Sequence, residues 1–479
     1  MILLDGESLS CRQLHDIAHG APVQVHPTSA WQMKQNSMTA PEENSILQDK
    51  RSLLIGPNSN PSSSDDLARA FILGHCAGVG DPLPAPLVRA AMAARVNVLA
   101  TGCTGARPAA AGALLAMLNQ GVHPRVPSQG SVGAAGDLAP MAHIAAVACG
   151  YVKRPDGLPD FSPTPKEALA LINGVSLTTG MAAMTVVRAR RVMENALLAT
   201  AMTMEALMAH RGCLDERALN ARGHAGPRLV GRRLRELLDG SELLREDGQP
   251  DAFSIRCAPQ VTGAVWRTLS FVEIETRTEL NGTSDNPLLM DGEWIESGNF
   301  HGSSIAMAMD HLKIALTQLA TLSERRTFRL THGQLSHDLP SFLVPGTGLN
   351  SGFMIAQYTA ASLASECKGL AHPASVDSIP TVQHHEDHVS MGPIAARMAL
   401  QLVECVADIV AIELLLAAQA LELRTKDSPR SMTSGLAKAH AMIREHVPFW
   451  TDDTVLHPDI AAMGALVRSG ALISDAGKW

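Results

Sequence analysis

The chain has 479 residues, 46% of them hydrophobic, which is enough to form a large buried core. Its formal net charge of -8 is mild for this length and its basic residues are scattered, which argues against a nucleic acid as a partner. The 8 cysteines form no CxxC pair, so we expect free thiols in a reducing compartment and not a disulfide framework or a zinc site.

Neither the first residues nor the most apolar run of the chain indicates a membrane protein. The first residues, "MILLDGESLS", lack the basic region of a signal peptide. The most apolar run, residues 408–424, is short and contains Glu413 and Glu422, which favours a buried helix over a membrane span. We therefore expect a soluble, cytoplasmic protein.

The N-terminal part of the chain is predicted to be rich in loops. Residues 33–50 and 56–66 are polar and contain many Pro, Ser and Asn residues. From Asp65 the pattern changes to apolar residues at helical spacing behind Ser and Asp caps. We divide the chain into an N-terminal cap region, residues 1–85, and a helical-bundle domain, residues 86–479.

The second region is predicted to be helical throughout, so the fold class is all-α with a long central helix bundle. Aromatic residues are only 3% of the chain, and Ala, Leu and Met, which favour helices, form the core instead. Long helices are expected at 166–172, 175–210, 228–238, 256–282, 303–329, 352–369, 391–424 and 431–446. Several, such as 391–424, are apolar almost all round, which indicates a bundle centre or the interface of a homo-oligomer.

The glycine-rich segment "GSVGAAGDLAPMAH", residues 130–143, is the strongest candidate for a functional loop. Its glycines permit backbone conformations that are closed to other residues, and Asp137 stands where it could cap a helix that begins at Leu138. A helix N-terminus favours a bound anion. A tight turn in front of a core helix is the structural alternative.

This loop resembles the signature GSVGASGDLAPLAH of the histidine/phenylalanine ammonia-lyase family. Further segments resemble the histidine branch of that family in the same order along the chain, among them "ALALINGVSLTTG", "DAFSIRCAPQVTGA", "SGNFHG", "EDHVSMG" and "AIELLLAAQALELR". The resemblance implies an all-α homotetramer with active sites assembled from three subunits. It also implies an electrophile, a methylidene-imidazolone, made in the family from an Ala-Ser-Gly tripeptide by cyclisation and loss of water.

The chain departs from the family at the residues that carry this chemistry. The tripeptide here is Ala134-Ala135-Gly136, and Ala135 has no hydroxyl to lose, so we expect no methylidene-imidazolone and no other cofactor. The family's two active-site tyrosines fall on Ile55 and Phe253. The Asn-Gln pair of the family's NQEDHV motif is replaced by His384-His385.

Other family positions are retained. The resemblance implies that Arg256 binds the substrate carboxylate and that His75 selects the substrate side chain. We expect a catalytic set of Glu386, His385 and His75, and a substrate-binding set of Arg256, Asn173, Phe300 and Phe253. The structural alternatives are an ordinary core or interface arginine at Arg256, and a Glu386 that only pairs with His388 or caps a helix.

The run "HHEDH", residues 384–388, also permits a metal hypothesis. His384 and His388 are four residues apart and would share one face of a helix, and histidine with carboxylate suits zinc or iron. The family has Glu-Asp-His here without a metal, so we expect none and keep His384 and His388 only as candidate ligands.

Three functions follow from this pattern. The first is a divergent enzyme that acts on an amino acid or a related small carboxylate without a methylidene-imidazolone. The second is a non-catalytic member of the family that binds a ligand or stabilises an assembly. The third is an ordinary histidine ammonia-lyase with an engineered Ser-to-Ala change. Loss of the tyrosines favours the first two, and retention of Arg256, Asn173, His75 and Glu386 favours the first.

Overall fold

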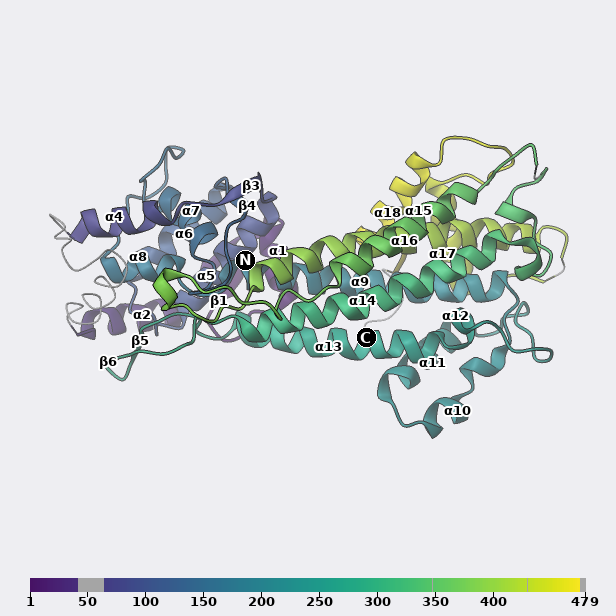
Figure 1. Ribbon diagram of the computed structural model, residues 1–479, viewed down its shortest axis with the longest axis horizontal. Helices are drawn as coiled ribbons and strands as arrows, with labels where there is room; N and C mark the ends of the chain where they lie inside the picture. The colour runs from purple at the N-terminus through teal and green to yellow at the C-terminus, as the bar shows by residue number, and fades with distance from the viewer. Residues whose placement is uncertain (42–63, 347, 429, 474–479) are drawn as a thin grey trace. The chain divides into compact units, whose positions relative to one another are not determined.

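The computed structural model describes residues 1–41, 64–346, 348–428 and 430–473. Helices dominate the chain, and its strands, β1 to β6, form only small two-stranded sheets (Figure 1). The prediction of an all-α fold is therefore confirmed. The chain divides into two compact units: unit 1 comprises residues 1–187, 272–310 and 373–400, and unit 2 comprises residues 188–271, 311–372 and 401–479. The predicted boundary at residue 85 stays a prediction.

Unit 1 begins with a small parallel sheet. Strand β1 (Ile2–Leu4) pairs with β2 (Val23–Val25), and helix α1 (Cys11–Ala18) connects them. A capping box starts α1, because Ser10 accepts from the backbone of Gln13 and the Gln13 side chain accepts in return. Helix α2 (Pro27–Thr39) follows.

The core of unit 1 surrounds α5 (Ala85–Ala100), which is buried along nearly its whole length. Helices α1 and α6 (Pro108–Gln120) pack on it, and α4 (Ser64–His75) packs on α7 (Leu138–Ala148) and α8 (Pro165–Ile172) (Figure 1). The buried guanidinium of Arg89 in α5 joins this helix to α1 and α6, because it donates to the carbonyl oxygens of Ile17 in α1 and Leu118 in α6. Strand β3 (Val79–Pro82) pairs with β4 (Pro127–Gln129), and β5 (Leu288–Met290) with β6 (Glu293–Ile295).

The longest helices contribute residues to both units. They are α9 (Ser176–Ala206), α13 (Ala258–Leu280), α14 (Ser303–Thr331) and α16 (Gly392–Thr425). They agree closely with the helices predicted at 175–210, 256–282, 303–329 and 391–424. Small and aliphatic residues explain them, since α16 buries Ala, Leu, Ile and Val side chains on all its faces.

Within unit 2, a buried ion pair joins three of these helices. The Arg326 guanidinium of α14 lies 2.5 Å from the Glu413 carboxylate of α16, and both side chains are fully buried. Thr203 of α9 and Ser323 of α14 donate their hydroxyls to the same carboxylate, at 2.9 and 2.6 Å. The apolar run that contains Glu413 is therefore a buried helix, as predicted. The Glu413 carboxylate accepts hydrogen bonds from two hydroxyls and from two N–H groups of Arg326.

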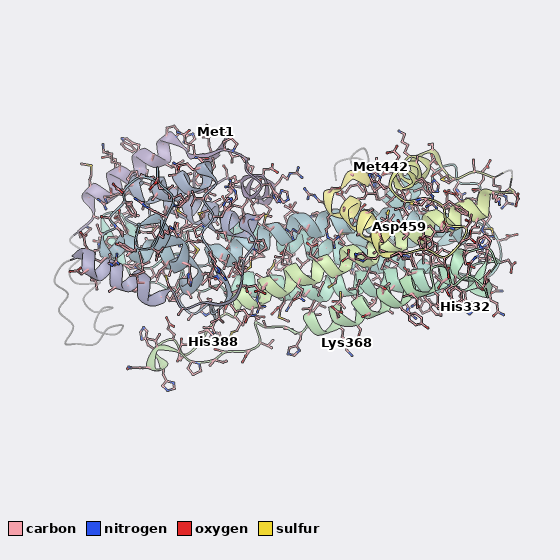
Figure 2. The ribbon with its side chains drawn as sticks, turned by 90° about the horizontal axis from the view of Figure 1, so that it is seen from above. Met1, His332, Lys368, His388, Met442 and Asp459 are labelled. Atoms are coloured by element: carbon pink, nitrogen blue, oxygen red, sulfur yellow. The ribbon has the colours of Figure 1, made fainter. Side chains whose placement is uncertain are left out.

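The shorter helices of unit 2 complete it. They are α10 (Glu216–Ala221), α11 (Ala225–Leu237), α12 (Phe253–Arg256), α15 (Met354–Leu370), α17 (Ser434–His446) and α18 (His457–Ser469). Figure 2 labels Met442 in α17 and Asp459 in α18. Trp450 lies in the segment that connects these two helices, and its indole N–H donates to the Asp459 carboxylate at 2.8 Å. Over the described parts of the chain, no helix combines the length and the apolarity that crossing a membrane requires.

Candidate active site

Unit 1 contains a cavity of about 410 Å³ whose wall is built from several distant segments of the chain. The end of α4, the loop before α7, the end of α8, the segment before α14 and the connection from α15 to α16 all contribute. The predicted site residues in this wall are His75, Ala134, Ala135, Asn173, Phe300, His385, Glu386 and His388. The fold thus gathers most of the residues predicted from the sequence at one place.

The glycine-rich loop adopts a shape that only glycine permits at two points. Gly133 and Gly136 have φ angles of 70° and 86°, in the left-handed region. A Cβ atom at Gly136 would lie 2.2 Å from the carbonyl oxygen of Gly174, which itself has a φ of 84°. Glycine at 136 is therefore required by the close approach of the Gly174 backbone, and glycine at 174 by the close approach of the Ser284 backbone.

Main-chain hydrogen bonds fix this loop against its neighbours. The N–H of Asp137 donates to Gly174 at 2.8 Å, and the N–H of Gly174 donates to the carbonyl oxygen of Ala135 at 3.1 Å. On the other side, the Ser390 hydroxyl donates to the carbonyl oxygen of Gly133 at 3.1 Å. The loop is held from both sides through atoms that do not belong to the side chain of Ala135.

Asp137 does not cap α7 with its side chain, which corrects the predicted role. It occupies the N-cap position, but its carboxylate accepts instead from the backbone N–H and the hydroxyl of Thr178, at 2.8 and 2.7 Å. Burial raises the pKa of Asp137 to about 6, although the Thr178 hydrogen bonds and the Arg95 charge act in the opposite direction. Its hydrogen bonds therefore attach the loop to the start of α9.

A buried polar cluster supports Asn173 at the end of α8. The Asn173 amide donates to Asp285 at 2.9 Å and to the carbonyl oxygen of Asn286 at 3.1 Å, and Lys166 pairs with Asp285 at 2.8 Å. Burial raises the pKa of Asp285, but Lys166 and Arg95 outweigh it and hold the pKa below its usual value. The Asn173 side-chain oxygen is buried and accepts no hydrogen bond from any residue that the structure describes.

Sequence reasoning missed Asp285, Lys166 and Arg95 as supports of the site. Arg95 is fully buried in α5 and donates to the carbonyl oxygens of Asn173 and Ser284. The segment "SDNPLL", residues 284–289, contains Asp285 and is the part of the sequence that could have pointed to this acid. A buried lysine and arginine cannot be recognised from the sequence until the fold shows what they contact.

His75 presents a defined hydrogen-bonding group to the cavity. Its Nδ1 lies 2.7 Å from the carbonyl oxygen of Phe71, and since a carbonyl only accepts, Nδ1 carries the proton. In the neutral ring Nε2 is then an acceptor. The Phe71 ring packs against the imidazole in a tilted arrangement, with ring centroids 4.5 Å apart and an angle of 54° between the ring planes.

The histidine-rich segment before α16 forms the remaining wall. One Glu386 oxygen accepts from the Thr381 hydroxyl at 2.7 Å, and Glu386 pairs with Thr381 and not with His388. His388, marked in Figure 2, has its ring 5.6 Å from that of His301, and its carbonyl oxygen lies 3.3 Å from the His301 Nε2. His384 does not line the cavity. Residues 382–384 all have left-handed φ angles, an unusual run for side chains other than glycine.

Two predicted substrate-binding residues lie in unit 2. Arg256 lines a separate cavity of about 510 Å³, together with Arg222, Asp251 and Gln260. Phe253, at the start of α12, is 71% exposed. Ile55, at the position of a family tyrosine, lies outside the described residues. The roles of Arg256 and Phe253 stay predictions.

The metal hypothesis gains no geometric support in the part of the chain that the structure describes. There, no group of three or more His, Cys, Asp or Glu side chains is placed to hold a metal ion.

Comparison with known proteins identifies the class of enzyme. The family model described as "Aromatic amino acid lyase" matches residues 55–445, so the chain belongs to this family and is a lyase. It is 43% identical to the histidine ammonia-lyase of Caldanaerobacter subterraneus subsp. tengcongensis, over 85% of this chain and 84% of the relative. It is 42% identical to the histidine ammonia-lyase of Anaeromyxobacter sp. (strain K), over 98% of this chain and 99% of the relative. The crystal structure of histidine ammonia-lyase from Trypanosoma cruzi superposes on this chain with a TM-score of 0.88 and 37% sequence identity. The match covers 98% of this chain and 94% of the Trypanosoma cruzi chain.

These comparisons correct the prediction that the protein has no cofactor. Members of the family to which the chain belongs use a methylidene-imidazolone formed from their own polypeptide. The corresponding loop is retained here and lines the cavity. Ala135 contributes a methyl group where the family's route to this group requires a hydroxyl, so the tripeptide does not itself fit that route. The roles that can be assigned from this chain are those of the side chains around the loop.

Proposed function

We propose that the protein is an ammonia-lyase for an α-amino acid with an imidazole-like side chain, histidine being the first candidate, and that the cavity of unit 1 is its active site. The observation that carries this proposal is the buried, unpartnered side-chain oxygen of Asn173, which shares one cavity with His75 and Glu386. The names of the relatives, which are histidine ammonia-lyases, support the substrate class.

The cavity offers partners for the amino group and for the side chain of such a substrate. The Asn173 oxygen accepts from the amino group, because a buried acceptor without a hydrogen bond is costly and a bound N–H satisfies it. The His75 Nε2 accepts from the N–H of an imidazole side chain, since its Nδ1 is occupied by Phe71. Phe300 supplies an apolar wall.

Ammonia elimination breaks the C–N bond, and the nitrogen leaves with the bonding electron pair. A proton is lost from the adjacent carbon, whose electron pair forms the new C=C bond. Glu386 and His385 are the groups that we assign to proton transfer, because both line the cavity and one Glu386 oxygen is left open by Thr381. Ala135 stands at the position of the family's serine, and this substitution sets the chain apart from the family signature.

We further propose a homotetramer in which Arg256 of one subunit completes the cavity of another and binds the substrate carboxylate. Arg256 is exposed in unit 2 and has no ion pair within the described chain. Large apolar side chains on α13, α14 and α15 are also exposed, as expected for a surface that other subunits cover: Phe271, Ile274, Met307, Ile355 and Tyr358.

Calorimetry with histidine and an assay for urocanate, which absorbs in the near ultraviolet, test this function together. We expect histidine to bind, and Arg256→Ala to weaken it by about 1.5–3 kcal/mol, the usual contribution of a hydrogen bond to a charged group. Arg222→Ala, which removes another arginine from the same cavity of unit 2, is the matched control and should leave binding unchanged.

The outcomes separate the alternatives. Absence of binding for histidine and related imidazole acids contradicts the proposed substrate class. Tight binding without product identifies a ligand-binding protein in place of an enzyme. A stable monomer in light scattering at micromolar concentration contradicts the tetramer.

A further inference from the structure

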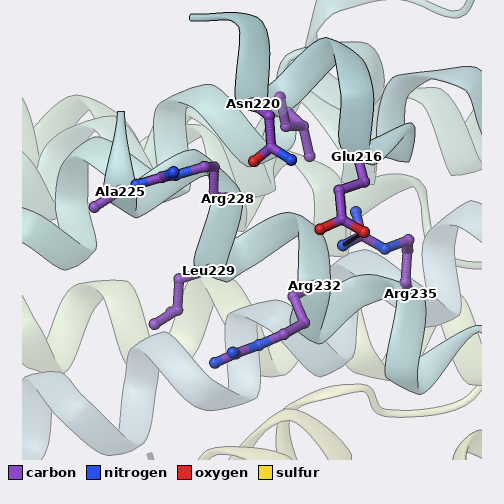
Figure 3. Close-up of a pocket in the computed structure, with 8 residues that line it drawn as sticks. Glu216, Asn220, Ala225, Arg228, Leu229, Arg232 and Arg235 are labelled. Atoms are coloured by element: carbon purple, nitrogen blue, oxygen red, sulfur yellow. Dashed lines mark ion pairs between the residues drawn. The ribbon is translucent and has the colours of Figure 1, made fainter. Parts of the chain in front are cut away.

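A third cavity, of about 290 Å³, lies in unit 2 between α10 and α11 (Figure 3), beside the cavity of Arg256, with which it shares Leu219 but no charged residue. Three arginines of α11 line it: Arg228, Arg232 and Arg235. Their spacing of four and three residues places them on one face of the helix. Glu216 and Asn220 of α10 stand opposite.

The positive charge of this cavity is only partly neutralised. Arg235 lies 3.5 Å from Glu216, and Figure 3 shows this pair on one side of the cavity, with Arg228 and Arg232 on the other. Arg232 lies 3.8 Å from Glu236, but Glu236 is closer to Arg233, at 3.0 Å. Arg228 has no ion pair with any residue that the structure describes. Three guanidinium groups therefore face one lining carboxylate, in a chain whose net charge is -8.

The cavity has a fixed apolar wall as well as charge. Leu219 is buried, and a Cβ at Gly231 would lie 2.2 Å from its side chain, so glycine allows α10 and α11 to pack closely beside the cavity. Leu229 and Ala225 line the cavity too. A merely solvated arginine face would need neither this close packing nor an enclosing second helix.

We propose that this cavity binds the phosphate group of a small phosphorylated molecule. The planar guanidinium fork donates two parallel hydrogen bonds to phosphate oxygens, and two or three arginines match the dianion in charge. The Asn220 amide is a further donor. The apolar wall of Leu219, Ala225 and Leu229 contacts the organic part, which free phosphate lacks.

The test is calorimetry on the full-length protein at low salt, with adenosine monophosphate and inorganic phosphate as two separate probes. Wild type is compared with Arg228→Gln and Arg232→Gln. The control is Arg217→Gln, which removes an exposed arginine of α10 that pairs with Asp215 at 2.6 Å and does not line the cavity. Histidine binding, measured on the same samples, reports separately on the active site.

We expect the nucleotide to bind, and each cavity variant to weaken it about tenfold or more, with no effect of the control. Equal affinity for inorganic phosphate would retain the phosphate site and assign it to the free ion. Two results would overturn the proposal: no binding of either probe at millimolar concentration, or the same loss of affinity in Arg217→Gln as in the cavity variants. Circular dichroism confirms that each variant is folded.

Discussion

The carbonyl oxygen of Ala135 accepts a hydrogen bond from the backbone N–H of Gly174 at 3.1 Å, and the carbonyl oxygen of Gly174 accepts one from the N–H of Asp137 at 2.8 Å. Two separate backbone segments therefore form a short parallel bridge at the edge of the cavity of unit 1. None of these atoms belongs to a side chain. The shape of the loop is consequently independent of whether residue 135 carries a methyl or a hydroxymethyl group.

This independence makes Ala135→Ser an informative variant. It restores the Ala-Ser-Gly tripeptide in a loop whose backbone is already bent at Gly133 and Gly136. We expect cyclisation, in which the Gly136 nitrogen attacks the carbonyl carbon of residue 134 and two waters are lost. Mass spectrometry of the variant should show this loss in the peptide that contains residues 134–136. A variant with its full encoded mass would contradict the prediction.

Urocanate formation by the same variant should stay slow. The resemblance to the family aligns Phe253 with an active-site tyrosine, and we expect its phenyl ring to be unable to accept or relay a proton there. Loss of a positioned acid–base group typically lowers the rate on the order of a hundred- to ten-thousandfold. Rapid turnover of histidine by Ala135→Ser would show that the chain has another base in place.

Gly174→Ala is expected to abolish folding of unit 1. The new Cβ would lie 2.0 Å from the carbonyl oxygen of Ser284, and the backbone has a φ of 84°. The matched control is Gly121→Ala, where φ is 68° but no atom lies within 4 Å of the new Cβ. The control should lose only about 1–2 kcal/mol, the cost of a left-handed alanine. Soluble yield and thermal melting compare the two, and equal behaviour would contradict the close contact.

Asp137 should give the protein a specific dependence of stability on pH. Its pKa is raised by burial from 3.8 to about 6, so between these values the folded protein holds a proton that the unfolded chain has released. The contribution of this group to the free energy of unfolding therefore falls as the pH rises through that window, by about 3 kcal/mol in all.

Asp137→Asn removes this titration and keeps both contacts, since its amide can donate to the Thr178 hydroxyl and accept from the Thr178 N–H. The free energy of unfolding of wild type minus that of the variant should fall between pH 4 and pH 7 in denaturant titrations. A difference that rises or stays level over this range would contradict the raised pKa.

Glu413→Gln should destabilise the core of unit 2. It leaves the fully buried Arg326 guanidinium with an unneutralised charge, a situation that costs about 3–5 kcal/mol. Glu236→Gln, which removes a carboxylate half exposed to solvent beside Arg233, should change the free energy of unfolding by less than about 0.5 kcal/mol. Denaturant unfolding measures both, and similar effects would contradict the importance of burial.

Much of the fold could be predicted because composition and spacing determine helices locally. The long helices α9, α14 and α16 follow from runs rich in Ala, Leu and Met that have no proline or glycine after their fifth residue. The loop was equally visible, since its glycines stand where the backbone must be left-handed. The role of Asp137 was not, because a side chain that could cap α7 instead reaches Thr178 of the next long helix.

The candidate site was only partly predictable for a related reason. Motif resemblance gathered His75, Asn173 and Glu386, which do line one cavity. It could not reveal Asp285 and Lys166, whose role depends on burial and on a partner more than a hundred residues away. The prediction that no cofactor is used relied on one side chain, Ala135, and the family relationship overturned it.

The position of Asn173 gives the cavity a fixed polarity. Both N–H bonds of its amide are engaged, with Asp285 and with the carbonyl oxygen of Asn286, so the group cannot rotate to exchange its oxygen and nitrogen without breaking both. The side-chain atom of Asn173 that is left without a partner among the described residues is therefore always an acceptor. An α-keto acid, which has a second acceptor where an amino acid has N–H donors, would meet oxygen with oxygen, and the enzyme would discriminate the two before any bond is broken.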